Sequence, residues 1–263
     1  LPISDNCLPE AKVTALKALF AGPRNAKGET LYSDWPADGG VGMGNWRFWK
    51  VESPIPAWGN QSAIATMGAA SLALIFTTPP TAIDGTNDKL IEFLTAFDLD
   101  KDAPKIFARD ATYKESAMEF MTPPDVDNPK LAGLAGTKRR MIVYHGQSDP
   151  VFSVNDTIRW YERLDANSGG KAADFARLFA LPGVTHCGGG IGLERFDALT
   201  ALMDWVEKGN APERITASVN AANKEIPSEW SPARTRPLCP WPAFARYKGG
   251  DLEQESSFEC VRP

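Results

Sequence analysis

Residues 139–209 alternate between short apolar runs and amphipathic segments, and this alternation constrains the fold more than any other feature of the chain. The apolar runs 139–146 and 175–183 predict buried strands. The segments 154–166 and 195–209 have the apolar spacing of helices. A strand, a helix and a second strand in this order give a parallel pair joined by a crossover helix. The pattern therefore predicts an α/β fold with a parallel sheet.

The first half of the chain lacks this alternation. Its expected elements are helices at 8–20, 61–76 and 88–98, a weaker helical pattern at 104–121, glycine- and tryptophan-rich loops at 23–60, and a linker at 122–129. We therefore expect an irregular, helix-bearing region over residues 1–135. A region with the strand and helix pattern and a C-terminal tail should follow over residues 136–263.

The composition of the chain excludes several classes of binding partner and site. The 263 residues carry a net charge of −5, which argues against nucleic acid or an anionic membrane. The longest apolar run, 69–76, is too short to cross a bilayer. None of the four cysteines forms a C-x-x-C pair, so a zinc ribbon or a thioredoxin-type site is not expected. Disulfides in a secreted or periplasmic protein suit this cysteine pattern better.

Asp149 and His186 follow the two predicted strands. Because parallel strands end at one edge of a sheet, the loops carrying these residues should lie together there. A carboxylate that accepts from one imidazole nitrogen leaves the other nitrogen available as a general base. Their chain order, with 37 positions between them, is that of the acid and base in α/β-hydrolases. The pair predicts acid–base catalysis.

A nucleophile is harder to find. Ser148 lies in only half of a Gly-x-Ser-x-Gly motif, because Pro150 occupies the second glycine position and would crowd the turn. Ser62 has no better context. A metal-dependent hydrolase using His145 and His186 is a weaker alternative, because no glutamate or cysteine motif accompanies these histidines. We therefore predict no metal ligands in this chain.

The cysteines suggest one internal bond. Cys239 and Cys260 are 21 positions apart in the tail, and a disulfide between them would contribute roughly 3 kcal/mol. Cys7 and Cys187 remain. From the residues alone, they pair either with each other or with cysteines outside these 263 residues.

Four stretches resemble the C-terminal half of the tannase and feruloyl esterase family, which also includes a mono(hydroxyethyl) terephthalate hydrolase. They are "CLPEAKVTALKALFAGPRNAKGETLY", "YHGQSDPVFS", "LPGVTHCGGG" and "FDALTALMDWVEKGNAPERI". The resemblance implies an α/β-hydrolase fold with a lid inserted before the strand that carries the acid. Residues 1–135 would be the C-terminal portion of that lid, and residues 136–263 the C-terminal part of the catalytic domain.

The same resemblance assigns roles to residues. Asp149 would be the acid and His186 the base, and Cys187 would form a disulfide with a cysteine that precedes the nucleophilic serine. That serine, its cysteine and the oxyanion-hole segment are absent from this chain, so an upstream segment or a second chain of the same precursor would supply them. Cys7 would likewise have an upstream partner. A structural calcium ion, a family feature of the lid, would have its ligands upstream, and no cofactor is expected here.

The expected function is that of a secreted or periplasmic serine carboxylesterase acting on small esters of aromatic acids, such as hydroxycinnamic or gallic acid. Phe152, Trp46 and Trp49 are the candidates for the wall of an aromatic pocket. Two alternatives stay open. The chain is a non-catalytic binding subunit or an inactive fragment, or its substrates are terephthalate-type esters.

Overall fold

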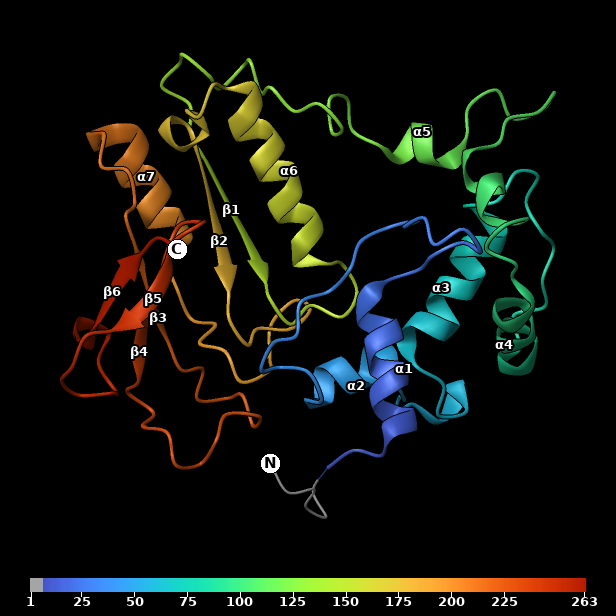
Figure 1. Ribbon diagram of the computed structural model, residues 1–263, viewed down its shortest axis with the longest axis horizontal. Helices are drawn as coiled ribbons and strands as arrows, with labels where there is room; N and C mark the ends of the chain where they lie inside the picture. Colours follow the sequence, from blue (N-terminus) through green and yellow to red (C-terminus); the bar gives the residue numbers. More distant parts are fainter. Residues whose placement is uncertain (1–6) are drawn as a thin grey trace.

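The two predicted strands form a parallel pair at the centre of the C-terminal region. The computed structural model describes residues 7–263, in which β1 (Met141–Gly146) and β2 (Ala176–Leu181) pair in register along their full length. The crossover between them is α6 (Val154–Asn167), and α7 (Ala198–Lys208) follows β2. The strand pair lies between these two helices (Figure 1). The α/β alternation predicted from the sequence is confirmed.

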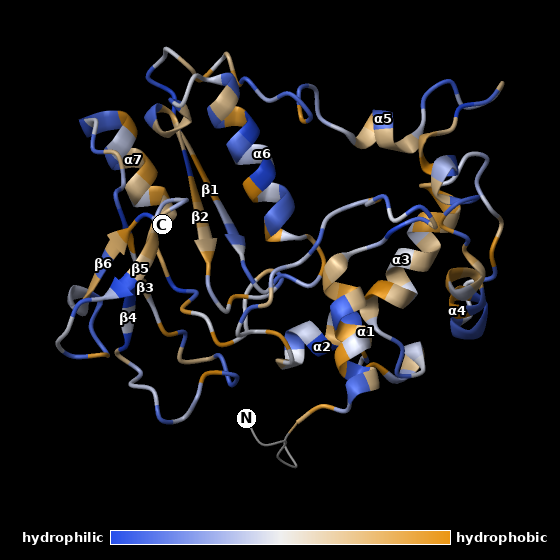
Figure 2. Ribbon diagram, in the orientation of Figure 1, coloured by the Kyte–Doolittle hydropathy of each residue, from blue (hydrophilic) through white to orange (hydrophobic). Residues whose placement is uncertain are grey.

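The side chains of β2 alternate between two cores. Leu178 packs with Tyr161 and Leu164 of α6, whereas Phe179 and Leu181 point to the opposite face. Burial of one such side chain contributes about 1.5–3 kcal/mol. In Figure 2, β2 is mostly apolar and α6 carries many polar residues. The strand is therefore buried on both faces, as strands of parallel sheets are.

The other strand, β1, is more exposed. The side chain of Tyr144 in its middle is 57% exposed. On the side away from β2, β1 pairs with no other strand among residues 7–263. The outer side of β2, by contrast, is partly covered by the tail, where the N–H of Trp241 donates to the carbonyl of Leu178 at 2.7 Å. The open edge of this sheet therefore lies along β1.

The tail contains short strands that the sequence analysis did not predict. Two antiparallel pairs are formed, by β3 (Ile215–Ser218) with β4 (Thr235–Leu238) and by β5 (Phe244–Tyr247) with β6 (Phe258–Val261). The predicted disulfide between Cys239 and Cys260 is present and links the end of β4 to β6. It joins the two hairpins covalently.

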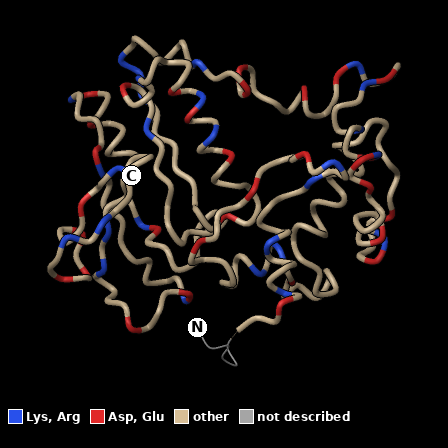
Figure 3. Tube along the Cα trace, viewed as in Figure 1, with Lys and Arg blue, Asp and Glu red and all other residues tan. Residues whose placement is uncertain are grey.

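The front region consists of short helices connected by long loops. The helices are α1 (Glu10–Ala21), α2 (Gly44–Lys50), α3 (Ala63–Leu74), α4 (Asn87–Ala96) and α5 (Ala117–Met121), with 3₁₀ turns at Pro56–Trp58 and Ala103–Phe107, and two more at Ala172–Asp174 and Glu255–Ser257 in the C-terminal region. Residues 53–83 contain no charged side chain, and the corresponding stretch around α3 is drawn in tan in Figure 3. Met67 on α3 is half-exposed, so this region presents apolar surface.

One predicted helix is wrong. The weak helical pattern at 104–121 is broken into a 3₁₀ turn and α5, because Asp110 folds back locally. Its carboxylate accepts from the backbone N–H groups of Thr112 and Tyr113, both at 2.7 Å. A new helix then begins at Ser116, which forms a capping box with Glu119. Local side-chain hydrogen bonds thus compete with the helix. Conversely, the helix α2 was not predicted, because it lies in the segment 23–60 that was expected to be loop.

In the described part of the chain, no helix is both long and apolar enough to cross a bilayer.

We expect the disulfide in the tail to contribute to stability. Replacing both Cys239 and Cys260 with alanine should lower the free energy of unfolding by roughly 3 kcal/mol, because the unfolded chain loses a closed loop with a separation of 21 residues. Urea unfolding of the oxidised protein and of the double variant measures this difference. An unchanged unfolding midpoint would contradict a stabilising role.

Candidate functional site

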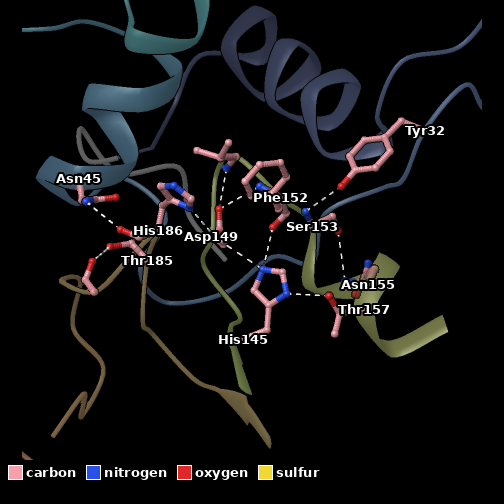
Figure 4. Close-up of polar contacts among 12 residues, drawn as sticks. Tyr32, Asn45, His145, Asp149, Phe152, Ser153, Asn155, Thr157, Thr185 and His186 are labelled. Carbon is pink, nitrogen blue, oxygen red and sulfur yellow. Dashed lines mark hydrogen bonds and ion pairs between the residues drawn. The ribbon is translucent and has the colours of Figure 1, made fainter. Parts of the chain in front are cut away.

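The loops that follow β1 and β2 bring Asp149 and His186 together. Nδ1 of His186 lies 2.9 Å from Oδ2 of Asp149 (Figure 4). The Asp149 residue is only 6% exposed, and the side chain of His186 is 18% exposed. The predicted proximity of the two residues is confirmed. The arrangement has the geometry of a carboxylate that orients an imidazole.

Asp149 uses its other oxygen to fix its own loop. Oδ1 accepts from the backbone N–H of Val151 at 2.7 Å and from that of Phe152 at 3.0 Å. These bonds form an Asx turn immediately after the strand. The turn fixes the rotation of the carboxylate, so that Oδ2 faces the imidazole of His186.

His145 is a second imidazole at this carboxylate. Its Nε2 lies 3.0 Å from the carbonyl oxygen of Phe152 and 3.4 Å from Oδ2 of Asp149. Because both neighbours are acceptors, Nε2 carries a proton. Nδ1 lies 2.7 Å from the hydroxyl of Thr157, which can donate to it. The sequence analysis placed His145 at the strand end but missed its contact with Asp149, four positions later.

These neighbours decide the charge of Asp149. Burial opposes ionisation and would raise the pKa of the carboxyl group. The hydrogen bonds from His145, His186 and the two backbone N–H groups outweigh burial and lower the pKa below its ordinary value. Asp149 is therefore ionised at neutral pH and can stabilise a positive charge on His186.

Aromatic rings flank His186 on the open side. The ring centroid of Trp49, on α2, lies 4.9 Å from that of His186, and the ring of Phe152 lies at 5.7 Å. Within residues 7–263, Nε2 of His186 makes no hydrogen bond. The imidazole thus contacts two aromatic side chains, and its second nitrogen keeps its capacity for a hydrogen bond.

Trp46, also predicted to line the pocket, is buried within the front region. Trp46 is 5% exposed and packs against Phe20 of α1, with 6.3 Å between the ring centroids. Trp46 and Trp49 occupy different faces of the short helix α2. Only the face that carries Asn45 and Trp49 is turned toward the His186 loop, where Nδ2 of Asn45 donates to the carbonyl of His186 at 3.3 Å.

A hollow of about 770 Å³ opens beside the acid–base pair. It lies next to the exposed strand β1, and its lining includes His145, Asp149, His186, Cys187, Phe196 and Leu199. The hollow therefore opens at the ends of both strands, next to the start of α7.

Cys187 is an exposed thiol in this hollow. Its φ of 61° is in the left-handed region, and the glycines at 188–190 also have positive φ. Two side-chain carboxylates nevertheless fix the turn, since the backbone N–H of Gly189 donates to Oε2 of Glu194 at 2.5 Å and that of Gly190 to Oε2 of Glu225 at 2.7 Å. The alternative disulfide between Cys7 and Cys187 is not formed.

The two serines considered above have structural roles. Ser148 is 2% exposed, and its hydroxyl donates to Oδ2 of Asp38 at 2.5 Å instead of facing His186. Ser62 is the N-cap of α3 and accepts from the N–H of Ala65 at 3.2 Å. These contacts agree with the sequence analysis, which found neither serine to be a suitable nucleophile.

The described residues do not fit a calcium ion. No group of three or more His, Cys, Asp or Glu side chains in residues 7–263 converges on a common point. The carboxylates of the acidic loop 98–102 instead accept backbone N–H groups, as Asp98 does from Asp100 at 2.9 Å. The upstream position of calcium ligands stays a prediction.

Comparison with known proteins adds the family. Residues 3–261 match the model of the family described as tannase and feruloyl esterase. A mono(2-hydroxyethyl) terephthalate hydrolase from Piscinibacter sakaiensis is 40% identical over 98% of the chain, which spans only 42% of that protein. A probable feruloyl esterase from Arthroderma benhamiae is 35% identical over 61% of the chain and 29% of its own length. The crystal structure of feruloyl esterase B from Aspergillus oryzae superposes on 97% of the chain with a TM-score of 0.56 and 19% identity, and the match covers 46% of it.

The lowered pKa of Asp149 makes a prediction about stability. Its ionised form stabilises the folded state above the unfolded pKa, near 3.8, and this contribution is lost as the pH falls through the lower folded-state pKa. Asp149→Asn should cost about 1–3 kcal/mol at pH 7, because hydrogen bonds to a charged group are lost. Urea unfolding should show this difference shrinking as the solution is acidified. A difference independent of pH would contradict the assignment.

Proposed function

The chain belongs to the tannase and feruloyl esterase family, and on that premise we propose that it supplies the acid and the base of a serine carboxylesterase. The observation that carries this proposal is the 2.9 Å contact between Nδ1 of His186 and ionised Asp149. It leaves Nε2 as the proton acceptor, in the role that a triad histidine has.

The proposed reaction follows from this geometry. Nε2 of His186 takes the proton of a serine hydroxyl while the serine oxygen attacks the carbonyl carbon of the ester. Asp149 stabilises the imidazolium through Nδ1, and Nε2 then gives the proton to the leaving alcohol. Water attacks the acyl-serine with Nε2 again as the base, and the carboxylic acid leaves as the serine is restored.

The serine is proposed to come from a segment upstream of these residues, or from a second chain of the same precursor. The chain spans less than half the length of the relatives it matches, and the match lies in their C-terminal part. The unpaired side of β1 offers a place for further strands of the sheet. The thiol of Cys187, exposed next to His186, supports a disulfide to that segment. An upstream partner for Cys7 is proposed from the family resemblance alone.

The two regions then take the roles expected from the sequence. Residues 1–135 would be part of a lid that covers the site, and residues 136–263 would complete the catalytic domain. Contacts of the front region with the His186 loop, through Asn45 and Trp49, support the lid. Any calcium ion would be held by the upstream segment.

The proposed substrates are small esters of aromatic acids. Trp49 and Phe152 flank His186 and offer aromatic faces close to the reacting nitrogen. Hydroxycinnamic, gallic and terephthalate-type esters all fit this description, and the names of the similar proteins include a feruloyl esterase and a terephthalate ester hydrolase. The disulfide in the tail supports a secreted or periplasmic location.

The function is tested with an activated benzoate ester and the complete natural protein that carries this chain. We expect turnover by the wild type and a loss of roughly 10⁴-fold or more in kcat for His186→Ala, because the base is removed. Ser148→Ala should lose no more than about 10- to 100-fold, since Ser148 is not the nucleophile and only holds its loop in place. The 263-residue chain alone should show no turnover.

Three outcomes would contradict the proposal. Robust turnover by the isolated chain would exclude an upstream serine. A loss in Ser148→Ala as large as that in His186→Ala would make Ser148 the nucleophile. Binding of the ester without turnover by the complete protein would favour a non-catalytic binding protein.

A second experiment tests the aromatic specificity. Trp49→Ala should lower kcat/KM for a benzoate ester about 10- to 100-fold more than for the matched acetate ester, because the lost contact is with the aromatic acyl group. Trp58→Ala, on the same region but without a contact to His186, is the matched control. Equal losses on both esters would show that Trp49 does not select the acyl group.

A further inference from the structure

Asp38 contacts both catalytic loops although it belongs to the front region. A single oxygen, Oδ2, accepts from the hydroxyl of Ser148 at 2.5 Å and from the backbone N–H of Gly183 at 2.7 Å. Ser148 precedes the proposed acid, and Gly183 lies three positions before the proposed base. One carboxylate thus connects segments that lie 110 and 145 residues further along the chain.

We propose that Asp38 is a positioning residue of the site, which sets the separation of the loops that carry Asp149 and His186. This inference rests on the proposed function, and it adds a residue from the lid to the acid–base machinery. Asp38 touches no reacting atom and acts only through the two loops.

The contacts around Ser148 form a closed ring. Its backbone N–H donates to the carbonyl of Val184 at 3.0 Å, and its hydroxyl donates to Asp38, which in turn accepts from Gly183. The hydroxyl also accepts from the N–H of Gly40 at 2.9 Å. Both hydrogen-bond donors of Ser148 therefore have acceptors. The loop that carries Asp149 is joined to the loop that carries His186 directly, through Val184, and indirectly, through Asp38.

The ring depends on a close approach of the backbone. A Cβ atom added to Gly40 would lie 2.5 Å from the hydroxyl of Ser148 and 2.9 Å from the carbonyl oxygen of Gly183. Gly183 has a φ of 73°, which other residues rarely adopt. Glycines at both points let the chain around Asp38 sit against the two loops.

The charge of Asp38 makes its bonds strong. Hydrogen bonds to an ionised carboxylate are shorter and roughly twice as strong as neutral ones. Such a bond to Gly183 restrains the start of the turn that ends at His186. Because a displacement of about 1 Å in a catalytic group can cost about 100-fold in rate, this restraint is worth more to catalysis than to stability.

The same segment carries the aromatic wall. Asn45 and Trp49, a few residues after Asp38, contact the backbone and the ring of His186. Glu225 accepts from the N–H groups of both Gly44 and Gly190, which ties α2 to the turn after His186. Asp38 therefore anchors one end of a segment whose other end faces the substrate.

The test uses the complete natural protein with four variants, Asp38→Asn, Asp38→Ala, Ser148→Ala and Asp100→Asn. Asp100 is the matched control, because its carboxylate also holds a distant backbone N–H, that of Ala26 at 3.1 Å, but touches neither catalytic loop. The readouts are kcat and KM on the benzoate ester and the low-field proton resonance of the His186 Nδ1–H group, assigned by its loss in His186→Ala.

Both Asp38 variants should lose about 10- to 100-fold in kcat with little change in KM, because the base is displaced while Glu225 still holds α2 and its aromatic side chain against the base loop. The His186 resonance should broaden or vanish in them and stay unchanged in Asp100→Asn. Combining Asp38→Ala with Ser148→Ala should cost little more than Asp38→Ala alone, since both remove the same ring.

The inference is overturned if Asp38→Asn folds with kcat within about twofold of the wild type and an unchanged resonance. It is also overturned if Asp100→Asn shows the same losses, because the effect would then be general to the front region. If Asp38→Ala does not fold, Asp38→Asn alone decides. If the wild type hydrolyses no ester, the proposed function fails, while the resonance still tests the role of Asp38.

Discussion

The hydrogen bond between Asp149 and His186 depends on the parallel pairing of β1 with β2. Parallel strands end at the same edge, so residues 37 positions apart meet there without any direct local signal between them. The remaining acceptor capacity of Asp149 is taken by its own turn and by His145. The carboxylate of Asp149 is thus held by its own turn and by two imidazoles, and within residues 7–263 Nε2 of His186 makes no hydrogen bond.

The elements that the sequence predicted well are those with a strong local period or a short span. The strand and helix alternation and the Cys239–Cys260 bond belong to this group, and the contact of Asp149 with His186 follows from the alternation. The misses come from long-range or competing interactions. The contacts of Asp38 had no signal in the sequence, because its partners lie more than 100 residues away. Asp110 broke a helical pattern through hydrogen bonds to nearby backbone N–H groups. Trp46 and Trp49 differ only in which face of α2 they occupy, which composition does not reveal.

The two sides of the strand pair have different surroundings. The outer side of β2 is covered by the tail, whereas β1 is open and borders the hollow that contains His186. The front region contacts the loop that carries His186 through α2 and through Asp38. Asp149 and His186 therefore lie where the ends of the strand pair meet the front region, and hydrogen bonds from both sides restrain their loops.

The spacing of the cysteines also affects the order in which disulfides form during folding. The entropic cost of closing a loop rises with its length, so Cys239 and Cys260 meet readily once the tail has been synthesised. Cys187 lies in a turn that is already fixed by hydrogen bonds between backbone N–H groups and two carboxylates. Its thiol is exposed to solvent. During oxidative folding the tail can thus close its own ring early and remove two thiols from exchange. Fewer wrong partners then remain for the thiol beside His186.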